Sequence, residues 1–446
     1  MTQPDQPKRR RRRGVILTPH GLQKLQNAKS DAEFEENAGN RYTLEAMSER
    51  TGLAVDTLMK VFACESGVDK QTLKYCFRAF NLTLEPKDYC FPEQQEGEEQ
   101  SIEVEPLEPV ITPELPEGQV PLDSTFYVER PPIEAESYKT VLQPGSLIRI
   151  KGTRRMGKTS LLARILDHAA QHHYQTVSLS FQLADRSVFQ DLNRLLKWFC
   201  ASVGLAMQLP SRLADYWDDV FGSQISCKMY FEQYLLAKTS QPLVLGLDDV
   251  DRLFQFPDLA GDFFGLLRAW HEEGKNREIW KKLRLVVVHS TDVYIPLDAN
   301  RSPFNVGLPI ELKPFSPDQV QELANRYQFE WSADEIAQLM ELVGGQPYLI
   351  KKGLYHIWHQ DVNLEELLQT AVTGDGVYGD HLQRQLWNLQ RYPELVEAYM
   401  QVLQQPSTAE LDLFQASQLQ SMGLIYLQGD RPIPACELYR QYFLSK

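Results

Sequence analysis

The segment that most restricts the fold is a phosphate-loop motif at residues 152–159, which fits G-x-x-x-x-G-K-[ST] at every fixed position. Residues 147–150 (LIRI) indicate a strand before the loop, and residues 160–168 indicate a helix after it. Glycines let backbone N–H groups turn toward an anion, and the helix N-terminus adds a positive dipole end. We therefore expect a nucleotide site that includes Gly152, Thr153, Arg154, Arg155, Met156, Gly157, Lys158, Thr159 and Ser160.

Two carboxylates follow the apolar run at residues 243–247 and predict a second part of the same site. Ligands of open α/β sheets bind at the carboxyl ends of the strands, where a charge must be solvated or paired. We predict that Lys158 reaches the β- and γ-phosphates, and that Thr159 and Asp248 hold Mg²⁺. Asp249 is predicted to orient or deprotonate the attacking water, which makes Lys158 and Asp249 the candidate catalytic residues.

A third polar group follows the apolar run at residues 283–288. Ser290, Thr291 and Asp292 are each candidates for sensing the γ-phosphate, and a simple turn explains the same residues equally well. The chain lacks the Asn/Thr-Lys-x-Asp motif that recognises guanine. The expected ligands are therefore ATP or ADP together with Mg²⁺.

Strand-like and helix-like stretches alternate through residues 126–312, a pattern that predicts an α/β nucleotide-binding domain with a parallel five-stranded sheet. Residues 313–365 look mostly helical. The last unit, residues 366–446, combines helices with a hairpin whose turn is Gly429-Asp430. The expected strands are residues 147–150, 176–181, 243–247, 283–289 and 308–312.

Composition limits the class of protein and divides the chain. The net charge of −14 argues against indiscriminate binding of nucleic acid, but residues 1–90 carry 15 Lys and Arg against 12 Asp and Glu. Six cysteines without a C-x-x-C pair predict a reduced, cytoplasmic protein without a zinc site. No apolar run approaches the roughly 20 residues that span a bilayer, so no membrane partner is expected.

The chain before residue 126 changes character twice. Residues 1–13 form a basic tail, and residues 14–90 are expected to fold as a compact all-α domain. Residues 91–121 hold nine Glu and several Pro with no Lys or Arg. Such a segment repels itself and lacks apolar side chains to bury, so we predict an extended acidic linker over residues 91–125.

Residues 43–61 fit a helix-turn-helix frame, with Gly52 at the turn. If this unit binds DNA, Arg50, Thr57 and Lys60 would meet the duplex, and residues 9–13 would contact phosphates. The acidic neighbours of these residues and the modest net charge of +3 weaken that reading. We therefore favour protein partners that bind through residues 14–90, with DNA as the alternative.

Residues 126–446 resemble the bacterial AAA-like domain proteins, a branch of the STAND-type P-loop ATPases. The resemblance implies that Tyr127 and Pro347 lie near the adenine, that residues 313–365 form a helical lid and that residues 366–446 form a winged helix. It also implies that ATP closes the lid and wing onto the core, whereas ADP often locks the resting form. The matching stretches are FYVERPP at 126–132, GTRRMGKTSLL at 152–162, LDDVDRLF at 247–254, VHSTD at 288–292, GGQPY at 344–348 and CELYRQYF at 436–443.

One residue departs from the family pattern, because related ATPases commonly have Glu where this chain has Asp249. The shorter side chain reaches less far, which suits a slow switch better than a motor. Residues 14–90 resemble the helix-turn-helix domain of vWA-MoxR-associated proteins. The arginine finger stays open among Arg252, Arg268, Arg277, Arg284 and Arg301.

Together these features predict an ATP-binding, Mg²⁺-dependent STAND-type ATPase that acts as a nucleotide-controlled switch in signalling or assembly and forms nucleotide-dependent homo-oligomers. Two alternatives remain. One is a nucleotide-gated scaffold with little hydrolysis. The other is a DNA-bound regulator or transposition-type accessory ATPase.

Overall fold

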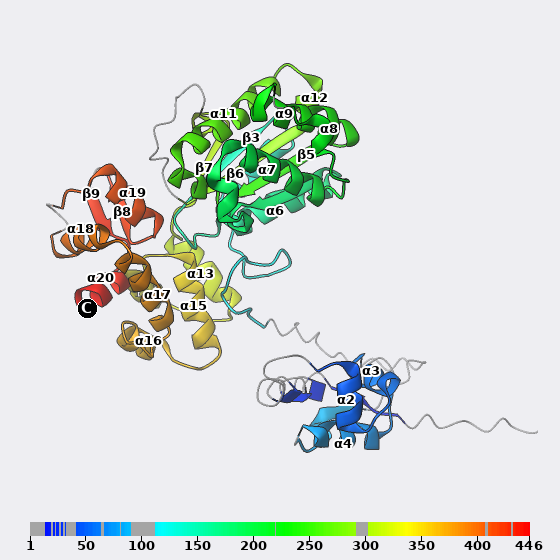
Figure 1. Ribbon diagram of the computed structural model, residues 1–446. Helices are drawn as coiled ribbons and strands as arrows, with labels where there is room; N and C mark the ends of the chain where they lie inside the picture. The colour runs from blue at the N-terminus through cyan, green and yellow to red at the C-terminus, as the bar shows by residue number, and fades with distance from the viewer. Residues whose placement is uncertain are drawn as a thin grey trace, which may run out of the picture. The chain divides into compact units, whose positions relative to one another are not determined.

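The computed structural model divides the chain into two compact units, Met1–Pro109 and Val110–Lys446 (Figure 1). The described residues are 14–18, 21–22, 24–25, 28–29, 32, 42–63, 67–80, 82–90, 112–218, 220–290, 302–405, 409–429 and 431–446. The basic tail, the first part of the predicted linker and the candidates Thr291, Asp292 and Arg301 lie outside the described residues.

In the described part of the first unit, three α-helices have defined bounds, further helical residues lie between 21 and 32, and two short strands pair antiparallel. The helix pair predicted within residues 43–61 is present, and Gly52 ends its first helix in the left-handed conformation with φ 71°. The helices pack through buried Leu58, Leu73 and Phe77. The elements are β1 (Ile16–Leu17), α2 (Leu44–Thr51), α3 (Val55–Ala63), α4 (Lys70–Ala79), the 3-10 helix Pro86–Asp88 and β2 (Tyr89–Cys90).

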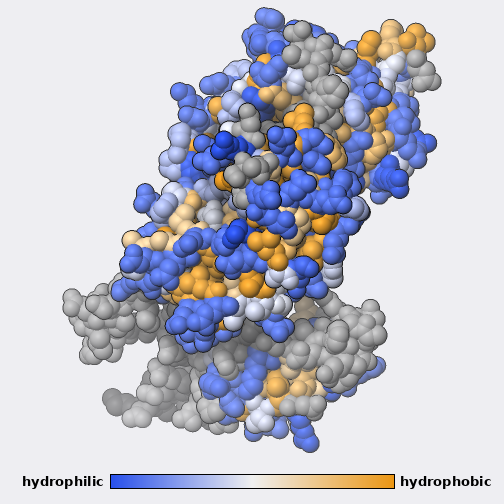
Figure 2. All heavy atoms as spheres, turned by 90° about the vertical axis from the view of Figure 1, so that its left-hand side faces the viewer, coloured by the Kyte–Doolittle hydropathy of each residue, from blue (hydrophilic) through white to orange (hydrophobic). Residues whose placement is uncertain are grey.

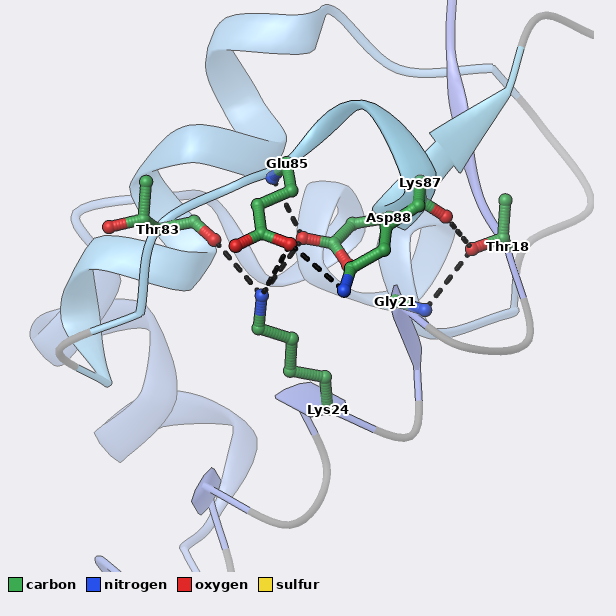
Figure 3. Close-up of polar contacts among 7 residues, drawn as sticks. All are labelled: Thr18, Gly21, Lys24, Thr83, Glu85, Lys87 and Asp88. Carbon is green, nitrogen blue, oxygen red and sulfur yellow. Dashed lines mark hydrogen bonds and ion pairs between the residues drawn. The ribbon is translucent and has the colours of Figure 1, made fainter.

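A buried acid ties the first unit together near β2 (Figure 3). The Asp88 side chain is fully buried and lies 3.2 Å from Lys24 Nζ, which also donates to the carbonyl of Thr83. The same carboxylate accepts from the backbone N–H of Glu85 at 2.8 Å. Removing Lys24 would therefore leave the buried Asp88 charge without its nearby cation, which is strongly destabilising.

The second unit is built on a five-stranded sheet in the order β4-β5-β6-β3-β7, and every pairing is parallel. This confirms the predicted parallel five-stranded α/β core, and each strand lies within two residues of its expected position. The strands are β3 (Leu147–Lys151), β4 (Gln175–Ser180), β5 (Leu243–Asp248), β6 (Leu283–His289) and β7 (Leu308–Glu311).

Alternate side chains of each strand enter different cores on the two faces of the sheet, as the period of two requires. Ile148 and Val286 pack toward α5 and α6, whereas Leu147 and Leu285 pack with residues of α7, α9 and α11. The helices of this layered core are α5 (Ile133–Val141), α6 (Lys158–Gln171), α7 (Leu192–Ala206), α8 (Leu213–Tyr216), α9 (Gly222–Tyr230), α10 (Leu236–Lys238), α11 (Pro257–Glu273) and α12 (Glu278–Lys281).

One glycine sets how closely α6 approaches the sheet. A Cβ added to Gly246 in β5 would lie 2.8 Å from Leu162 Cδ1, and a second methyl group, on Leu166, would lie at 3.3 Å. The helix that begins in the phosphate loop can therefore pack directly on the strand that carries Asp248. This contact fixes the spacing between the two halves of the predicted site.

The described residues after β7 form helices and loops apart from one hairpin, β8 (Ile425–Gln428) with β9 (Arg431–Pro434), which lies where the sequence predicts it. One hydrophobic cluster runs through the predicted lid and the predicted winged-helix unit and includes Phe126. These two regions therefore pack as one body. Their helices are α13 (Pro317–Arg326), α14 (Ala333–Val343), α15 (Pro347–Trp358), α16 (Leu364–Thr370), α17 (Gly379–Gln390), α18 (Pro393–Gln404), α19 (Leu413–Ser421) and α20 (Glu437–Leu444).

The linker prediction extends too far along the chain, because its last residues pack on the core. The backbone N–H of Val120 donates to Ser160 Oγ at 2.9 Å. Arg164 donates to the carbonyls of Val120 and Pro121 at 3.1 and 2.8 Å. Residues 112–121, called the strap below, are thus held against α6 by hydrogen bonds that an acidic, Pro-rich composition does not reveal.

The surface carries scattered hydrophobic groups. Figure 2 shows a face on which hydrophilic residues predominate and hydrophobic groups gather in smaller patches. Exposed examples are Trp387 and Leu413. Among the residues that the structure describes, no helix combines the length and the apolar character needed to cross a bilayer.

Candidate nucleotide-binding site

The phosphate loop joins the end of β3 to the start of α6, as the motif predicts. Gly157 precedes the helix with φ 93°, a conformation that favours glycine. Lys158 is the first helical residue, with an exposed fraction of 8%, and its Nζ donates to the carbonyl of Thr153 at 3.0 Å. In this arrangement the lysine lies folded back across the loop, and the N-terminus of α6 faces the space that a phosphate would fill.

The acids at the end of β5 lie beside the phosphate loop, at the same edge of the sheet. Thr159 Oγ1 donates to Asp248 Oδ2 at 2.7 Å, which joins the two residues predicted to hold Mg²⁺ although they lie 89 positions apart. The Asp248 side chain also accepts from the backbone N–H of Asp249 at 2.9 Å. The structure thus brings the two halves of the predicted site together.

Asp249 leaves the strand in a left-handed conformation, with φ 55° and ψ 35°. Aspartate tolerates this region better than most residues, and the turn points the next residues into the 3-10 helix Val250–Gln255. Its carboxylate accepts from Ser180 Oγ at 3.1 Å, at the tip of neighbouring β4. The predicted water-activating residue is therefore held by a hydroxyl from an adjacent strand.

Burial disfavours the charged forms of the acids and the lysine at this site. Burial raises the pKa of Asp248, and the neighbouring Asp249 raises it further. Burial lowers the pKa of Lys158, against the pull of Asp251, Asp248 and Asp249. Ionisable groups whose pKa values are shifted by burial are typical of functional sites.

Asp251 is a site residue that the sequence analysis missed. Burial raises its pKa, while Lys158 acts in the opposite direction, and Asp251 Oδ1 accepts from the backbone N–H of Ser290 at 3.3 Å. Of the three sensor candidates only Ser290 is described, and it lies beside this acid. The spacing D-D-x-D after an apolar strand was the available signal.

The donor set suits Mg²⁺. The hydroxyl of Thr159 and the carboxylate of Asp248 are hard oxygen donors, the type that Mg²⁺ prefers. In the described part of the chain, no group of three or more His, Cys, Asp or Glu side chains could hold a metal by itself. A magnesium ion here would therefore need further oxygen ligands, which nucleotide phosphates and water supply.

A cavity of about 530 Å³ opens beside the loop. The strap forms one wall, α15 contributes Pro347 and Lys351, and α17 contributes Arg384. The loop residues Arg155, Gly157 and Ser160 line the same space. Pro347 therefore lies next to the phosphate loop, whereas no pattern in the sequence pointed to the strap, Lys351 or Arg384.

In the segment 126–130, Arg130 contacts the phosphate loop, and Tyr127 contacts α5 and α6. Arg130 donates to the carbonyl of Met156 at 2.8 Å, and its guanidinium lies over the ring of Phe315. The Tyr127 hydroxyl donates to Glu134 at 2.8 Å, and the Arg164 guanidinium lies 3.6 Å from the centre of its ring. Tyr127, which the family resemblance places near the adenine, is not among the described residues that line the cavity.

The four described arginine-finger candidates all have partners within this chain. Arg252 donates to the carbonyl of Phe181 at 2.7 Å, and Arg284 donates to the carbonyl of Lys281 at 2.7 Å. Arg268 and Arg277 pair with glutamates of the same domain. These contacts give each side chain a structural role.

The candidate DNA contacts of the first unit differ in their surroundings. Arg50 donates to the carbonyl of Ala79 at 2.9 Å and to the Tyr42 hydroxyl at 2.8 Å, and it stacks on two aromatic rings. Lys60 is exposed on α3, and Thr57 is half-buried there. Arg50 is thus part of the core packing, and Lys60 is the described candidate that stays accessible.

The fold and the site define an α/β P-loop core of the ATPase type. The chain belongs to the AAA-like domain family, whose sequence model matches residues 115–445. This confirms the family resemblance and extends it eleven residues toward the N-terminus, into the strap. No match to a curated protein is found.

Several solved structures are similar to part of the chain. The Walker-type ATPase paby2304 of Pyrococcus abyssi is 14% identical with a TM-score of 0.48, over 71% of this chain and 96% of that chain. The ORC2 protein of Aeropyrum pernix is 12% identical with a TM-score of 0.39, over 70% and 93%. Domain III of the Thermotoga maritima replication initiation protein DnaA is 17% identical with a TM-score of 0.35, over 54% and 91%. Such low scores support no inference about this chain.

Proposed function

We propose that this chain is an ATP-binding, Mg²⁺-dependent regulatory ATPase of the STAND type, which acts as a nucleotide-controlled switch. The observation that carries the proposal is the meeting of Thr159 with Asp248 at 2.7 Å beside a phosphate loop of the G-x-x-x-x-G-K-[ST] type. A loop of this kind binds phosphate through backbone N–H groups, and the acids beside it suit a divalent ion.

Each residue has a role in this mechanism. Lys158 would leave the carbonyl of Thr153 and donate to the β- and γ-phosphates. Thr159 and Asp248 would hold Mg²⁺, which neutralises charge on the phosphate oxygens. Asp249, held by the Ser180 hydroxyl, would accept a hydrogen bond from the attacking water and orient it toward the γ-phosphate.

Titration with ATP, ADP and GTP, with and without Mg²⁺, tests this proposal on the wild-type chain and on Lys158→Ala. We expect adenine nucleotides to bind the wild type, and the variant to bind at least tenfold more weakly because it loses charge-assisted hydrogen bonds (a loss of about 1.5–3 kcal/mol). Lys275→Ala removes an exposed lysine paired with Glu272 and serves as the matched control. Equal ATP affinity in the wild type and Lys158→Ala would contradict the proposal.

A second candidate is a nucleotide-gated scaffold with little hydrolysis. Asp249 favours it, because its side chain is short and already accepts a hydrogen bond from Ser180. Single-turnover hydrolysis by the wild type separates the two candidates. Brisk turnover rejects the scaffold, whereas tight binding without turnover rejects the ATPase.

A further inference from the structure

One residue of the phosphate loop contacts the C-terminal helices. Arg155 Nη1 lies 2.9 Å from Nδ1 of His381 in α17, although the two residues are 226 positions apart. Its guanidinium also lies 3.9 Å from the centre of the Tyr348 ring, at the start of α15. The rest of the Arg155 side chain is exposed and lines the cavity beside the loop. A ligand in that cavity could therefore reach it.

The partner of Arg155 is a neutral imidazole. Burial first, and then the positive charges of Arg155, Lys352 and Arg384, lower the pKa of His381 to about 3. Because arginine can only donate, Nδ1 of His381 accepts, and the ring proton lies on Nε2. Nε2 then donates to the Tyr439 hydroxyl of α20 at 2.7 Å. Both His381 and Tyr439 are buried, with exposed fractions of 2% and 1%.

Neighbouring contacts join His381 and Tyr439 to the C-terminal core. Gln385, one turn after His381 on α17, donates to the carbonyl of Met422 at 3.0 Å. Tyr439 belongs to the hydrophobic cluster that also contains Leu382 and Met422. The position of the Arg155 side chain is thus tied to the packing of α17 and α20.

Arg155 has no anionic partner among the described residues. Its contacts are a neutral nitrogen and an aromatic face, and Lys352 and Arg384 add positive charge around His381. Hydrogen bonds between a guanidinium and a phosphate are charge-assisted and about twice as strong as neutral ones. A phosphate that reaches this loop would therefore attract Arg155 more strongly than His381 does.

We propose that Arg155 is a phosphate-contacting residue that His381 holds when the loop is empty, so that nucleotide phosphate and the C-terminal helices compete for one guanidinium. The proposal rests on the proposed function, because it names how nucleotide at that site reaches the rest of the chain. Nucleotide binding then releases the Arg155 contact and loosens α17 and α20, which differs from the closure of lid and wing that the family resemblance implies.

Opposite changes in affinity test the competition. In the full-length chain, Arg155→Ala should bind ATP about tenfold more weakly, because a charge-assisted contact is lost. His381→Leu, which removes the competing acceptor and stays apolar inside the core, should bind ATP more tightly than the wild type. Tyr439→Phe removes the acceptor of the His381 proton and should give a smaller gain. A purely structural role predicts a loss or no change in both C-terminal variants, so that result would overturn the proposal.

Hydrogen exchange of α17 and α20 supplies the second readout. Without nucleotide, Arg155→Ala should exchange about tenfold faster there than the wild type, and a non-hydrolysable ATP analogue with Mg²⁺ should produce the same change in the wild type. Arg440→Ala, on the exposed side of α20, breaks only a surface pair with Glu437 and serves as the control. Slower exchange on nucleotide binding, or wild-type exchange in Arg155→Ala, overturns the competition. A wild-type chain that binds no nucleotide overturns the proposed function itself, which the titration detects separately.

Discussion

Two cations that the sequence marks as functional, Arg50 in the first unit and Lys158 in the phosphate loop, have very different surroundings. Arg50 has a carbonyl, a hydroxyl and two aromatic rings as partners, all supplied by its own unit. Lys158 is buried with one carbonyl acceptor, beside acids whose own pKa values burial raises. Partners from the same unit that satisfy a charge indicate a structural residue, whereas charged groups whose charged forms are disfavoured by burial indicate a binding site.

The largest effect is expected for Asp248→Asn. This change should weaken Mg²⁺-dependent nucleotide binding by about 10- to 100-fold, as the loss of a metal ligand or its support typically does. It should also raise the thermal midpoint of the nucleotide-free chain at pH 7, because a buried negative charge beside Asp249 disappears. Calorimetric titration and thermal unfolding measure the two effects. If the variant loses both stability and binding, Asp248 has a structural role like that of Arg50.

The pH dependence of stability tests the raised pKa of Asp248 directly. A carboxyl whose pKa is raised by folding contributes stability below its unfolded pKa, and this contribution is lost as pH rises through the folded pKa. The advantage of Asp248→Asn over the wild type should therefore be greatest at neutral pH and fade as the pH falls toward 4. Thermal unfolding at a series of pH values checks this, and an advantage that grows in acid would contradict it.

Arg50→Ala should show the opposite pattern. Loss of its hydrogen bonds and stacking should destabilise the first unit by about 2 kcal/mol. Hydrogen exchange of α2 and α4 in the full-length chain reports this loss. Arg78→Ala, an exposed arginine of α4, provides the matched control. If Arg50→Ala leaves exchange unchanged, the contrast with Lys158 fails.

Asp249 belongs to the candidate site, as Lys158 does, and also has a hydrogen-bond partner in its own unit, as Arg50 does. The variant Asp249→Glu tests its role. Glutamate reaches farther toward a water, so single-turnover hydrolysis should rise, by less than about tenfold. The left-handed backbone at this position should cost about 1 kcal/mol for the new side chain. Single-turnover kinetics and thermal unfolding measure the gain and the loss. Slower hydrolysis in the variant would show that Asp249 already has the required reach.

The smallest effect concerns Lys60, the accessible cation of α3. If the first unit binds DNA, Lys60→Ala should weaken binding a few-fold for all sequences and reduce the salt slope by about 1. The stability of the unit should not change, since Lys60 is exposed. Binding titrations at several salt concentrations measure this, with Arg78→Ala as the control. No binding at low salt removes DNA from the candidate partners.

Features defined by contiguous residues were predictable from the sequence. The phosphate loop, the five strands and the Asp248 position follow from local patterns of glycine, apolar and acidic residues, which act through the backbone near them. The pairing of Arg155 with His381 was not predictable, because packing of α17 against the loop brings together residues from distant parts of the chain. The contacts of Arg50 were not predictable for the same reason, since its partner Ala79 belongs to another helix.

The composition of the strap suggests an extended linker, but the strap packs on α6. This matters for the design of shorter fragments of the protein. A fragment cut at residue 126, where the alternating pattern begins, would lose one wall of the cavity. It would also remove the carbonyls of Val120 and Pro121, which accept hydrogen bonds from the buried Arg164 on α6. Fragments intended to retain ligand affinity should therefore start before residue 112. A shorter one would fold around the same sheet and yet report a falsely weak site.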